Sequence, residues 1–251
     1  IMEDHVISVN TQTDQEEVAQ LFQKYDFTSI PVVDSEGRLV GIITVDDIVD
    51  ILQQEATEDI EKMAAITPTD KPYMKTGVLE TWKKRIPWLL ILMISATFTG
   101  RIISHYEAAL ASYVVLTAFI PMLMDTGGNA GSQASVSIIR GLSLNEIDYS
   151  DTLKILLKEL LVGILIGATL AVANFVKLLV IDRVTVTIAA VVCLTLIVTV
   201  VFAKLVGCSL PVLAKRLGFD PAVMASPFIT TIVDALSLMM YFKIAGAILH
   251  I

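Results

Sequence analysis

The sequence predicts a mostly α-helical membrane protein, in which five transmembrane helices follow a small α/β domain and a connecting helix. Of its 251 residues 55% are hydrophobic, and the mean hydropathy is +0.72, which is typical of membrane proteins. Residues 1–80 hold 17 of the 26 acidic residues but only 5 of the 18 basic ones. An acidic soluble segment therefore precedes a membrane segment, and nucleic acid is excluded as a partner because this segment would repel phosphate.

We predict three parts: an α/β domain over residues 1–60 that ends in an acidic helix, a connector over 61–86 and a membrane domain over 87–251. In the first part, runs rich in β-branched residues alternate with helical periodicity. Strands are predicted at 6–9, 28–33 and 39–43, one helix at 14–25, and a second helix from residue 45. The predicted order is β-α-β-β-α.

Two segments of this domain carry a family resemblance: Ser29-Ile-Pro-Val-Val-Asp34 and Gly41-Ile-Ile-Thr-Val-Asp-Asp-Ile48. They resemble a cystathionine-β-synthase (CBS) module, which pairs with a second module to form adenine-nucleotide or regulatory sites. The resemblance implies that Thr44 and Asp47 face the phosphate and ribose of a nucleotide such as ATP, and Phe27 could stack on its adenine. In a simpler interpretation Thr44 caps the helix, Asp47 favours its N-terminus, and Phe27 is a core aromatic.

A run of acidic residues follows along the second helix. Spacings of three or four place many of them on shared faces, where like charges repel by a few tenths of a kcal/mol per pair. A solvated helix face accounts for such a run, and so does a low-affinity divalent-cation sensor, since hard cations bind carboxylate oxygens. The residues are Asp46, Asp47, Asp50, Glu55, Glu58 and Asp59.

Five apolar stretches predict the membrane spans, since about 20 residues cross the hydrocarbon core. They lie at approximately 88–104, 108–139, 159–181, 184–206 and 221–249. The second is too long for one straight helix. Pro121 and the glycines at 127, 128 and 131 predict a bend or break there, although the glycines could simply permit close packing.

Basic residues indicate the orientation of these spans. They precede the first span, follow the second, and lie between the fourth and fifth, whereas the other loops are nearly free of them. By the positive-inside rule the N-terminal domain is cytoplasmic and the C-terminus lies outside. We expect a multi-pass protein of the cell membrane.

Asp234 lies in the last span, within an otherwise apolar or hydroxylic stretch. A carboxylate at the bilayer centre costs about 2.5–3.5 kcal/mol on insertion scales, so such residues usually mark an ion path or site. The alternative is a neutral, hydrogen-bonded structural acid. Glu159 and Asp220, near the cytoplasmic ends of two spans, could attract cations into a vestibule or be ordinary interfacial acids, and Asp220 before Pro221 also marks a helix start.

One segment is specific enough to suggest a family: Pro121-Met-Leu-Met-Asp-Thr-Gly-Gly-Asn-Ala-Gly-Ser-Gln-Ala-Ser-Val-Ser-Ile-Ile-Arg-Gly141. It closely resembles the signature of the MgtE family of magnesium channels, and the resemblance extends over essentially the whole chain. It implies a homodimeric, Mg²⁺-selective channel of the bacterial plasma membrane, with a pore at the dimer axis. In that family the cytosolic part closes the pore when magnesium is plentiful. The family's N-terminal acidic domain and first CBS module are absent from this sequence.

The resemblance also assigns roles to residues. Asp234 matches the family's ion-selectivity residue, and in a dimer two such carboxylates would match the charge of a partly hydrated Mg²⁺. A helix over residues 69–85 is expected to plug the pore. The residues expected around the pore are Asn129, Ser132, Gln133, Ser226 and Thr230, and those expected in regulatory magnesium sites are Asp47, Asp50, Glu55, Glu58 and Asp59.

The chemistry of these positions leaves alternatives. Carbonyl groups freed near Pro227, with the amides of Asn129 and Gln133, could hydrogen-bond the waters of Mg²⁺, but the amides could equally join two helices. Ser132 departs from the family's pattern, in which Asn occurs, and Asp125 receives less weight than Asp234.

The sequence is compatible with other functions to different degrees. Met124-Asp-Thr-Gly127 looks like the active-site triplet of aspartic proteases, but it lies in an apolar helical stretch rather than on a β scaffold, and we expect no enzyme. A membrane-anchored CBS sensor without transport would need only one span. An ion-coupled carrier needs the same midplane site as a channel, so the residues leave that choice open.

Overall fold

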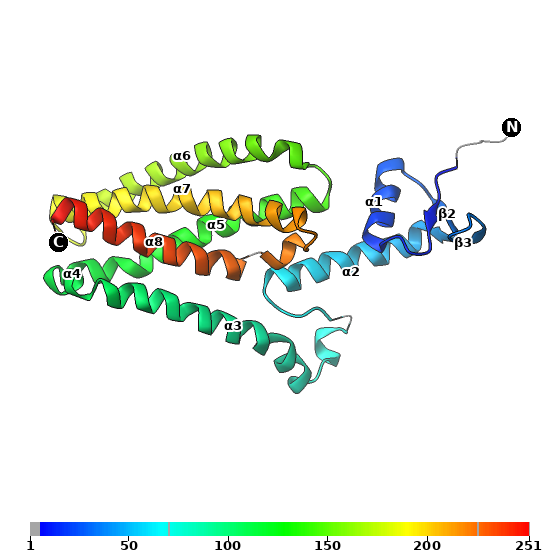
Figure 1. The fold of residues 1–251 in the computed structure, drawn as a ribbon, viewed down its shortest axis with the longest axis horizontal. Coiled ribbons are helices and arrows are strands. Elements are labelled where there is room, and N and C mark those ends of the chain that lie inside the picture. The colour runs from blue at the N-terminus through cyan, green and yellow to red at the C-terminus, as the bar shows by residue number, and fades with distance from the viewer. Residues whose placement is uncertain (1–5, 70, 225, 251) are drawn as a thin grey trace. The chain divides into compact units, whose positions relative to one another are not determined.

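The computed structural model describes residues 6–69, 71–224 and 226–250 (Figure 1). The chain forms two compact units, which are described separately. The N-terminal unit comprises Ile1–Glu61 and Pro68–Tyr73, and the helical unit comprises Lys62–Thr67 and Met74–Ile251.

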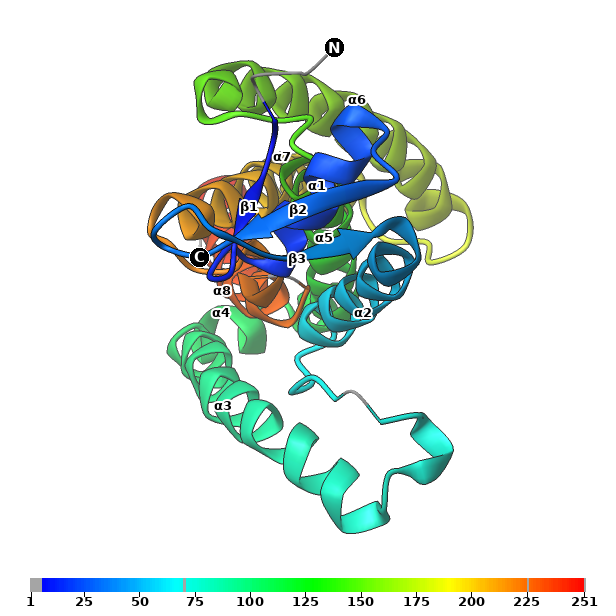
Figure 2. The same cartoon turned by 90° about the vertical axis from the view of Figure 1, so that its right-hand side faces the viewer.

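The N-terminal unit has the predicted β-α-β-β-α order. Its strands lie side by side in the order β1-β2-β3, with β1 parallel to β2 and β2 antiparallel to β3 (Figure 2). The first strand is shorter than predicted, because only its last two residues pair with β2. The elements are β1 (Val9–Asn10), α1 (Gln15–Tyr25), β2 (Ser29–Val33), β3 (Leu39–Thr44) and α2 (Val45–Met63).

A small hydrophobic core holds this unit together. Helix α1 begins where Asp14 accepts a hydrogen bond from the Glu16 backbone N–H, at 2.8 Å. Its helical spacing places three side chains on one face, against β1, β2 and the start of α2. The buried residues are Val9, Val18, Ala19, Phe22, Ile30 and Ile48.

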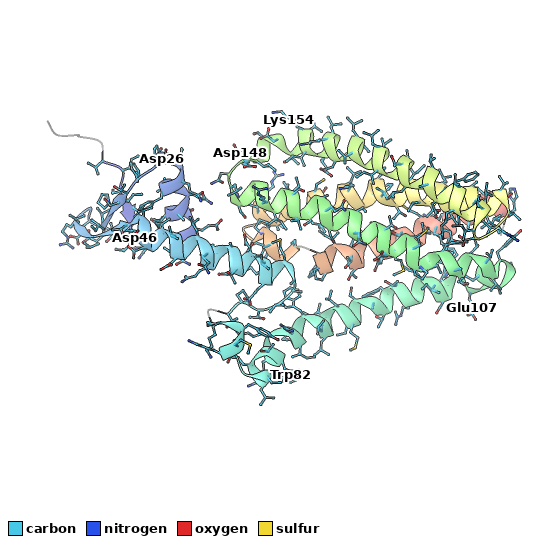
Figure 3. The ribbon with its side chains drawn as sticks, turned by 180° about the vertical axis from the view of Figure 1, so that it is seen from behind. Asp26, Asp46, Trp82, Glu107, Asp148 and Lys154 are labelled. Atoms are coloured by element: carbon cyan, nitrogen blue, oxygen red, sulfur yellow. The ribbon has the colours of Figure 1, made fainter. Side chains whose placement is uncertain are left out.

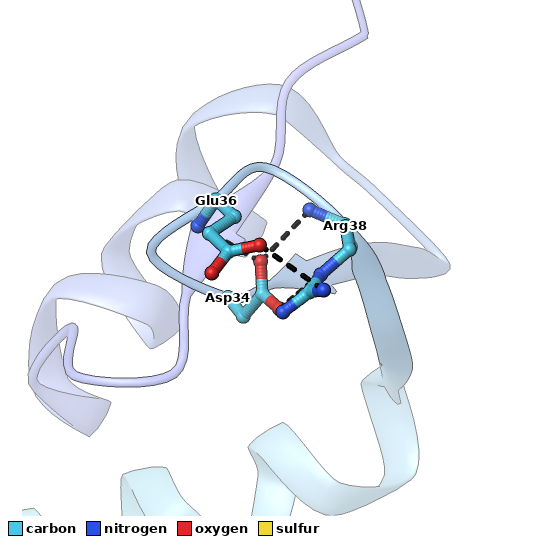
Figure 4. Close-up of polar contacts among 3 residues, drawn as sticks. All are labelled: Asp34, Glu36 and Arg38. Atoms are coloured by element: carbon cyan, nitrogen blue, oxygen red, sulfur yellow. Dashed lines mark hydrogen bonds and ion pairs between the residues drawn. The ribbon is translucent and has the colours of Figure 1, made fainter.

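The turn between β2 and β3 is closed by an Asp–Arg pair (Figure 4). One carboxylate oxygen of Asp34 accepts hydrogen bonds from the backbone N–H groups of Glu36 and Arg38, each at 2.9 Å. The other oxygen accepts from Arg38 Nε, also at 2.9 Å. These hydrogen bonds hold the pKa of Asp34 below its ordinary value, chiefly those from Arg38. Gly37 has a φ of +78°, a conformation that glycine adopts without strain.

The helical unit consists of long helices joined by short connections. In Figure 3, Glu107 lies at the opposite end of this unit from Asp148 and Lys154, so charged loops mark both ends. The helices are α3 (Val78–His105), α4 (Glu107–Ser112), α5 (Ile120–Ser143), α6 (Thr152–Val180), α7 (Val186–Arg216) and α8 (Ser226–Leu249). The 3-10 segments are η1 (Tyr73–Lys75), η2 (Val114–Phe119), η3 (Tyr149–Asp151) and η4 (Pro221–Met224).

Four segments among the described residues are long and apolar enough to cross a membrane: α3, α6, α7 and Pro221–Leu249. The prediction of a mostly helical protein with several membrane helices is therefore confirmed. The remaining predicted span, the second at 108–139, corresponds mainly to α5, which has 24 residues but carries a row of polar side chains. That α5 also crosses the membrane stays a prediction.

The second apolar stretch breaks before Pro121 rather than at the glycines. After α4 the chain passes through η2, and α5 starts at Ile120 with Pro121 in its first turn, where a missing N–H is tolerated. The glycines at 127, 128 and 131 lie inside a continuous helix and allow neighbouring helices to approach closely. Of the two interpretations of these glycines, close packing is confirmed.

The connector contributes no long helix of its own in the described residues. Between Met63 and Val78 they form only η1, and α3 runs from Val78 through Pro87 into the first predicted span. The plug role of residues 69–85 stays a prediction.

Helix α7 is the centre of the helical unit and packs against α5, α6 and α8 (Figure 1). The irregular segment η2 is supported from α8, where the buried Tyr241 donates its hydroxyl to Leu116 O at 3.0 Å. This hydrogen bond joins α8 to η2, 125 residues apart in sequence.

Candidate functional site

A row of polar side chains follows one face of α5. Asp125, Asn129 and Gln133 are exposed and spaced four residues apart, so they lie on one side of the helix. We call these three residues the polar stripe. The opposite face of α5 is buried, including Leu123 and Ala134. Hydrocarbon would leave the stripe without hydrogen-bond partners, so this face requires water or another polar surface.

Asp234 lies on α8, close to where that helix crosses α5. A Cβ on Gly128 would lie 3.0 Å from Thr230 Cγ2, and a Cβ on Gly127 would lie 2.8 Å from Val233 Cγ1. Thr230 lies one turn before Asp234, and Val233 lies directly before it. The half-buried side chain of Asp234 is therefore at the level of this crossing.

A second carboxylate lies near Asp234. Asp125 of α5 is close enough to interact electrostatically with it. Two acids from two helices thus gather next to the amide side chains of the stripe, an arrangement suited to a divalent cation that keeps part of its water. A role for Asp125 beside Asp234 stays a prediction, and its spacing of four from Asn129 is the signal in the sequence that places both on one face of α5.

The other residues expected around the pore differ in their placement. Ser132 is half-buried beside the stripe. Thr230 and Thr231 donate their hydroxyls to Pro227 O at 3.0 and 3.1 Å. A contact between other carbonyls near Pro227 and the waters of Mg²⁺ stays a prediction. The side chain of Ser226 lies outside the described part of the structure.

The two vestibule candidates are both engaged within the protein. Glu159 is largely buried, with its Oε2 3.8 Å from Lys204 Nζ. Asp220 accepts a hydrogen bond from Ala222 N at 2.8 Å, as its helix-start interpretation predicted, and its other oxygen pairs with Lys62 Nζ at 2.5 Å. A vestibule role for either acid stays a prediction.

The nucleotide-binding candidates of the N-terminal unit have structural partners. Asp47 Oδ2 accepts hydrogen bonds from the Thr44 hydroxyl at 2.7 Å and the Thr44 backbone N–H at 3.1 Å. These bonds, chiefly that from the hydroxyl, hold the pKa of Asp47 below its ordinary value. The ring of Phe27 stacks on Tyr25, with centroids 5.3 Å apart. The capping interpretation accounts for this geometry without a ligand.

The acidic run on α2 shows no cluster of three metal-ligating side chains in the described part of the chain. Among the described residues, no three His, Cys, Asp or Glu side chains are placed to hold a metal ion together. One member, Glu55, accepts a hydrogen bond from Gln15 Nε2 at 2.6 Å. The regulatory magnesium sites expected here stay a prediction.

Two known families match separate segments of the chain, one near its N-terminus and one in the helical unit. Residues 1–54 match the CBS domain, and residues 120–244 match MgtE, a divalent cation transporter. The second match contains the polar stripe and Asp234. The chain carries the membrane domain of the MgtE family. Both resemblances noted in the sequence are thereby confirmed.

Relatives named "Magnesium transporter MgtE" align with nearly the whole chain. The protein of Thermus thermophilus is 42% identical over 250 residues, and that of Bacillus subtilis is 39% identical over 254 residues. The protein of Enterococcus faecalis is 35% identical over 246 residues. The alignments cover 98–100% of this chain but 53–55% of the relatives, so the chain spans about half the length of the MgtE proteins it matches.

Proposed function

We propose that this chain conducts Mg²⁺ along the polar stripe of α5 and past Asp234. The observation that carries the proposal is an exposed row of polar side chains beside a second acid, in a unit whose other long helices are apolar enough to cross a membrane. The names of the relatives support magnesium as the ion. Mg²⁺ retains several waters and takes one or two carboxylates, and the amides of the stripe can hydrogen-bond those waters.

The pathway requires a second wall, which we assign to another copy of the chain. The stripe is exposed in one subunit, and a two-fold axis beside α5 would bring two stripes face to face. Each subunit would add Asp234 to the lining, so two carboxylates would match the charge of one Mg²⁺. A water-filled space between the stripes would serve a channel directly.

We place the protein in the plasma membrane of a bacterium, with the N-terminal unit in the cytoplasm and the C-terminus outside. Lys154 lies at the end of the helical unit that Asp148 marks (Figure 3), Lys158 is one turn further along α6, and Lys215 Nζ donates to Leu142 O at 2.9 Å. Basic residues at this end are what the positive-inside rule expects of a cytoplasmic face. Cytoplasmic Mg²⁺ would regulate the channel through the acidic residues of α2. ATP would act at the CBS module, with a second module completing its site.

Uptake of Mg²⁺ into proteoliposomes, followed with a trapped Mg²⁺-sensitive dye, tests this function. The chain with Asp234→Asn is compared with the unmodified chain and with Asp148→Asn, which neutralises an exposed acid outside the pathway. We expect the first substitution to abolish uptake or broaden its ion selectivity, and the second to leave it unchanged. Equal and selective uptake in all three would remove Asp234 from the pathway.

The same vesicles distinguish a channel from a carrier. A channel transports Mg²⁺ down its own gradient at a rate that does not require a proton or sodium gradient. A strict need for either gradient would replace the channel by an ion-coupled carrier. Absence of uptake by dimeric, folded protein would instead favour a CBS sensor without transport.

A further inference from the structure

Helices α6 and α7 pack closely along an antiparallel row of small residues. A Cβ on Gly163 would lie 3.1 Å from Val201 Cα, and a Cβ on Gly167 would lie 3.0 Å from Ile197 Cα. One turn further along α6, Ala171 O accepts a hydrogen bond from Cys193 Sγ at 3.3 Å. We call this contact the α6–α7 seam; small residues of this kind let membrane helices approach at backbone distance.

A charged pair closes one end of the seam in the same register. Glu159 is four residues before Gly163, and Lys204 is three residues after Val201. Their charged atoms, Oε2 and Nζ, are 3.8 Å apart, and the two side chains are only 13% and 6% exposed. The stem of Lys204 crosses Gly163, with its Cβ and Cγ 3.6 Å from where a Cβ of that glycine would be.

The small residues alone do not determine how α6 slides along α7. Gly163, Gly167 and Ala171 repeat every four residues, so a shift of one turn, about 5.4 Å, would again place small residues against α7. The charges do not tolerate that shift. Glu159 Oε2 has no hydrogen-bond partner among the described residues, so separation from Lys204 would leave a buried carboxylate with no compensating charge.

The position of α7 in turn determines the position of the pore-lining helix. The neighbours of Lys204 on α7 contact α5 at Gly131, where a Cβ would lie 3.1 Å from Ala203 O. Gly207 approaches the same glycine at backbone distance. Gly131 lies two residues before Gln133 of the polar stripe.

We propose that Glu159 and Lys204 form an intramembrane ion pair that sets the register of α6 on α7 and thereby holds α5 in place behind the ion pathway. Both are positioning residues, because they contact each other in the interior and not the polar stripe. The effect on transport rests on the proposed function, whereas the register itself does not.

Cross-linking measures the register without reference to transport. In a Cys208→Ser background, Ala171→Cys brings a thiol within reach of the native Cys193, because Cys193 Sγ already lies 3.3 Å from Ala171 O. Phe175→Cys, one turn further along α6, reports a shifted register. Oxidation in membranes followed by peptide mass spectrometry gives the ratio of the two disulfides.

We expect Glu159→Gln or Lys204→Met alone to lower the 171–193 disulfide relative to the 175–193 disulfide by about tenfold, because each leaves one buried charge unpaired. The double variant Glu159→Gln/Lys204→Met leaves no charge unpaired and should recover most of the original ratio. Unchanged ratios in both single variants would overturn the proposal.

Mg²⁺ uptake by the same variants separates this role from attraction of cations. If the pair positions helices, uptake falls in each single variant and recovers in the double variant. If the double variant keeps the native disulfide ratio but loses as much uptake as Glu159→Gln alone, Glu159 acts on the ion and the positioning role is overturned. Lack of uptake by the unmodified chain would refute the proposed function but leave the cross-linking test intact.

Discussion

Replacement of Gly207 by alanine tests the contact that holds α5 against α7. The added Cβ would lie 2.9 Å from the carbonyl carbon of Gly131 and 3.0 Å from its Cα, and closer still to its oxygen. Ordinary van der Waals contact begins at 3.4 Å, so the two helices would have to move apart by about 1 Å to relieve the overlap with the oxygen. The opposing atoms belong to the backbone, and no side-chain rotation can relieve the overlap.

The change in the free energy of unfolding of Gly207→Ala follows from two opposing effects. Overpacking of a close contact costs about 1–3 kcal/mol. Alanine in place of glycine inside a helix recovers at most about 1 kcal/mol. We therefore expect a net loss of about 1–2 kcal/mol, which for a chain of this size lowers Tm by about 2–8 °C. Movement of α5 should also lower Mg²⁺ uptake, since the polar stripe moves with the helix.

Thermal unfolding of the purified protein in detergent measures this loss, and uptake into proteoliposomes measures its functional effect. Gly100→Ala on α3 is the matched control, because a Cβ there would meet nothing within 4 Å. We expect the control to keep or slightly raise Tm. A Gly207→Ala variant that unfolds at the same temperature and transports at the same rate as the unmodified chain would refute the packing described for α5 and α7.

Two further predictions concern hydrogen bonds. Tyr241→Phe removes the donor to Leu116 O and should lower the free energy of unfolding by about 0.5–1.5 kcal/mol in the same assay, because one buried hydrogen bond is lost. An unchanged Tm would mean that η2 does not depend on this bond. The pKa of Asp47 is lowered in the folded protein, so its hydrogen bonds to Thr44 stabilise the start of α2 fully above about pH 4, the ordinary carboxyl range. This stabilisation is lost as the pH falls through the folded-state pKa. Amide hydrogen exchange in the first turn of α2 should accelerate on acidification in the unmodified chain. In Asp47→Asn the exchange rate should lack this acid-dependent acceleration. Identical pH profiles in the two proteins would contradict the capping role.

Local patterns accounted for much of the fold. Alternation of β-branched residues located β2 and β3, and Asp14 marked the start of α1, because strand and helix periodicity are local properties of the chain. The break in the second apolar stretch was less predictable. Proline ends one helix and starts another, and its neighbours in sequence do not show which of the two it does.

Contacts between distant segments could not be predicted from local patterns. The sequence identified Glu159 and Asp220 as acids near a membrane surface, but their partners Lys204 and Lys62 are separated from them by 45 and 158 residues. The role of the glycines was equally hidden, since the atoms that crowd Gly207 belong to another helix. Of the candidate site, residue type within an apolar stretch indicated Asp234, and the family resemblance indicated Asn129 and Gln133. The proximity of Asp125 to Asp234 depends on the crossing of α5 and α8, which local patterns do not show.

The polar stripe of α5 is proposed to line a water-filled path for Mg²⁺. Single cysteines at Asn129, Gln133 and Leu165, in a chain whose native cysteines are replaced by alanine, can be treated with a positively charged, membrane-impermeant methanethiosulfonate reagent. Leu165 is 69% exposed but lies on α6, one of the apolar membrane helices, and serves as the lipid-facing control. We predict that the two stripe cysteines react, that Mg²⁺ slows their reaction, and that Leu165→Cys does not react. Stripe cysteines as unreactive as Leu165→Cys would contradict the proposed path.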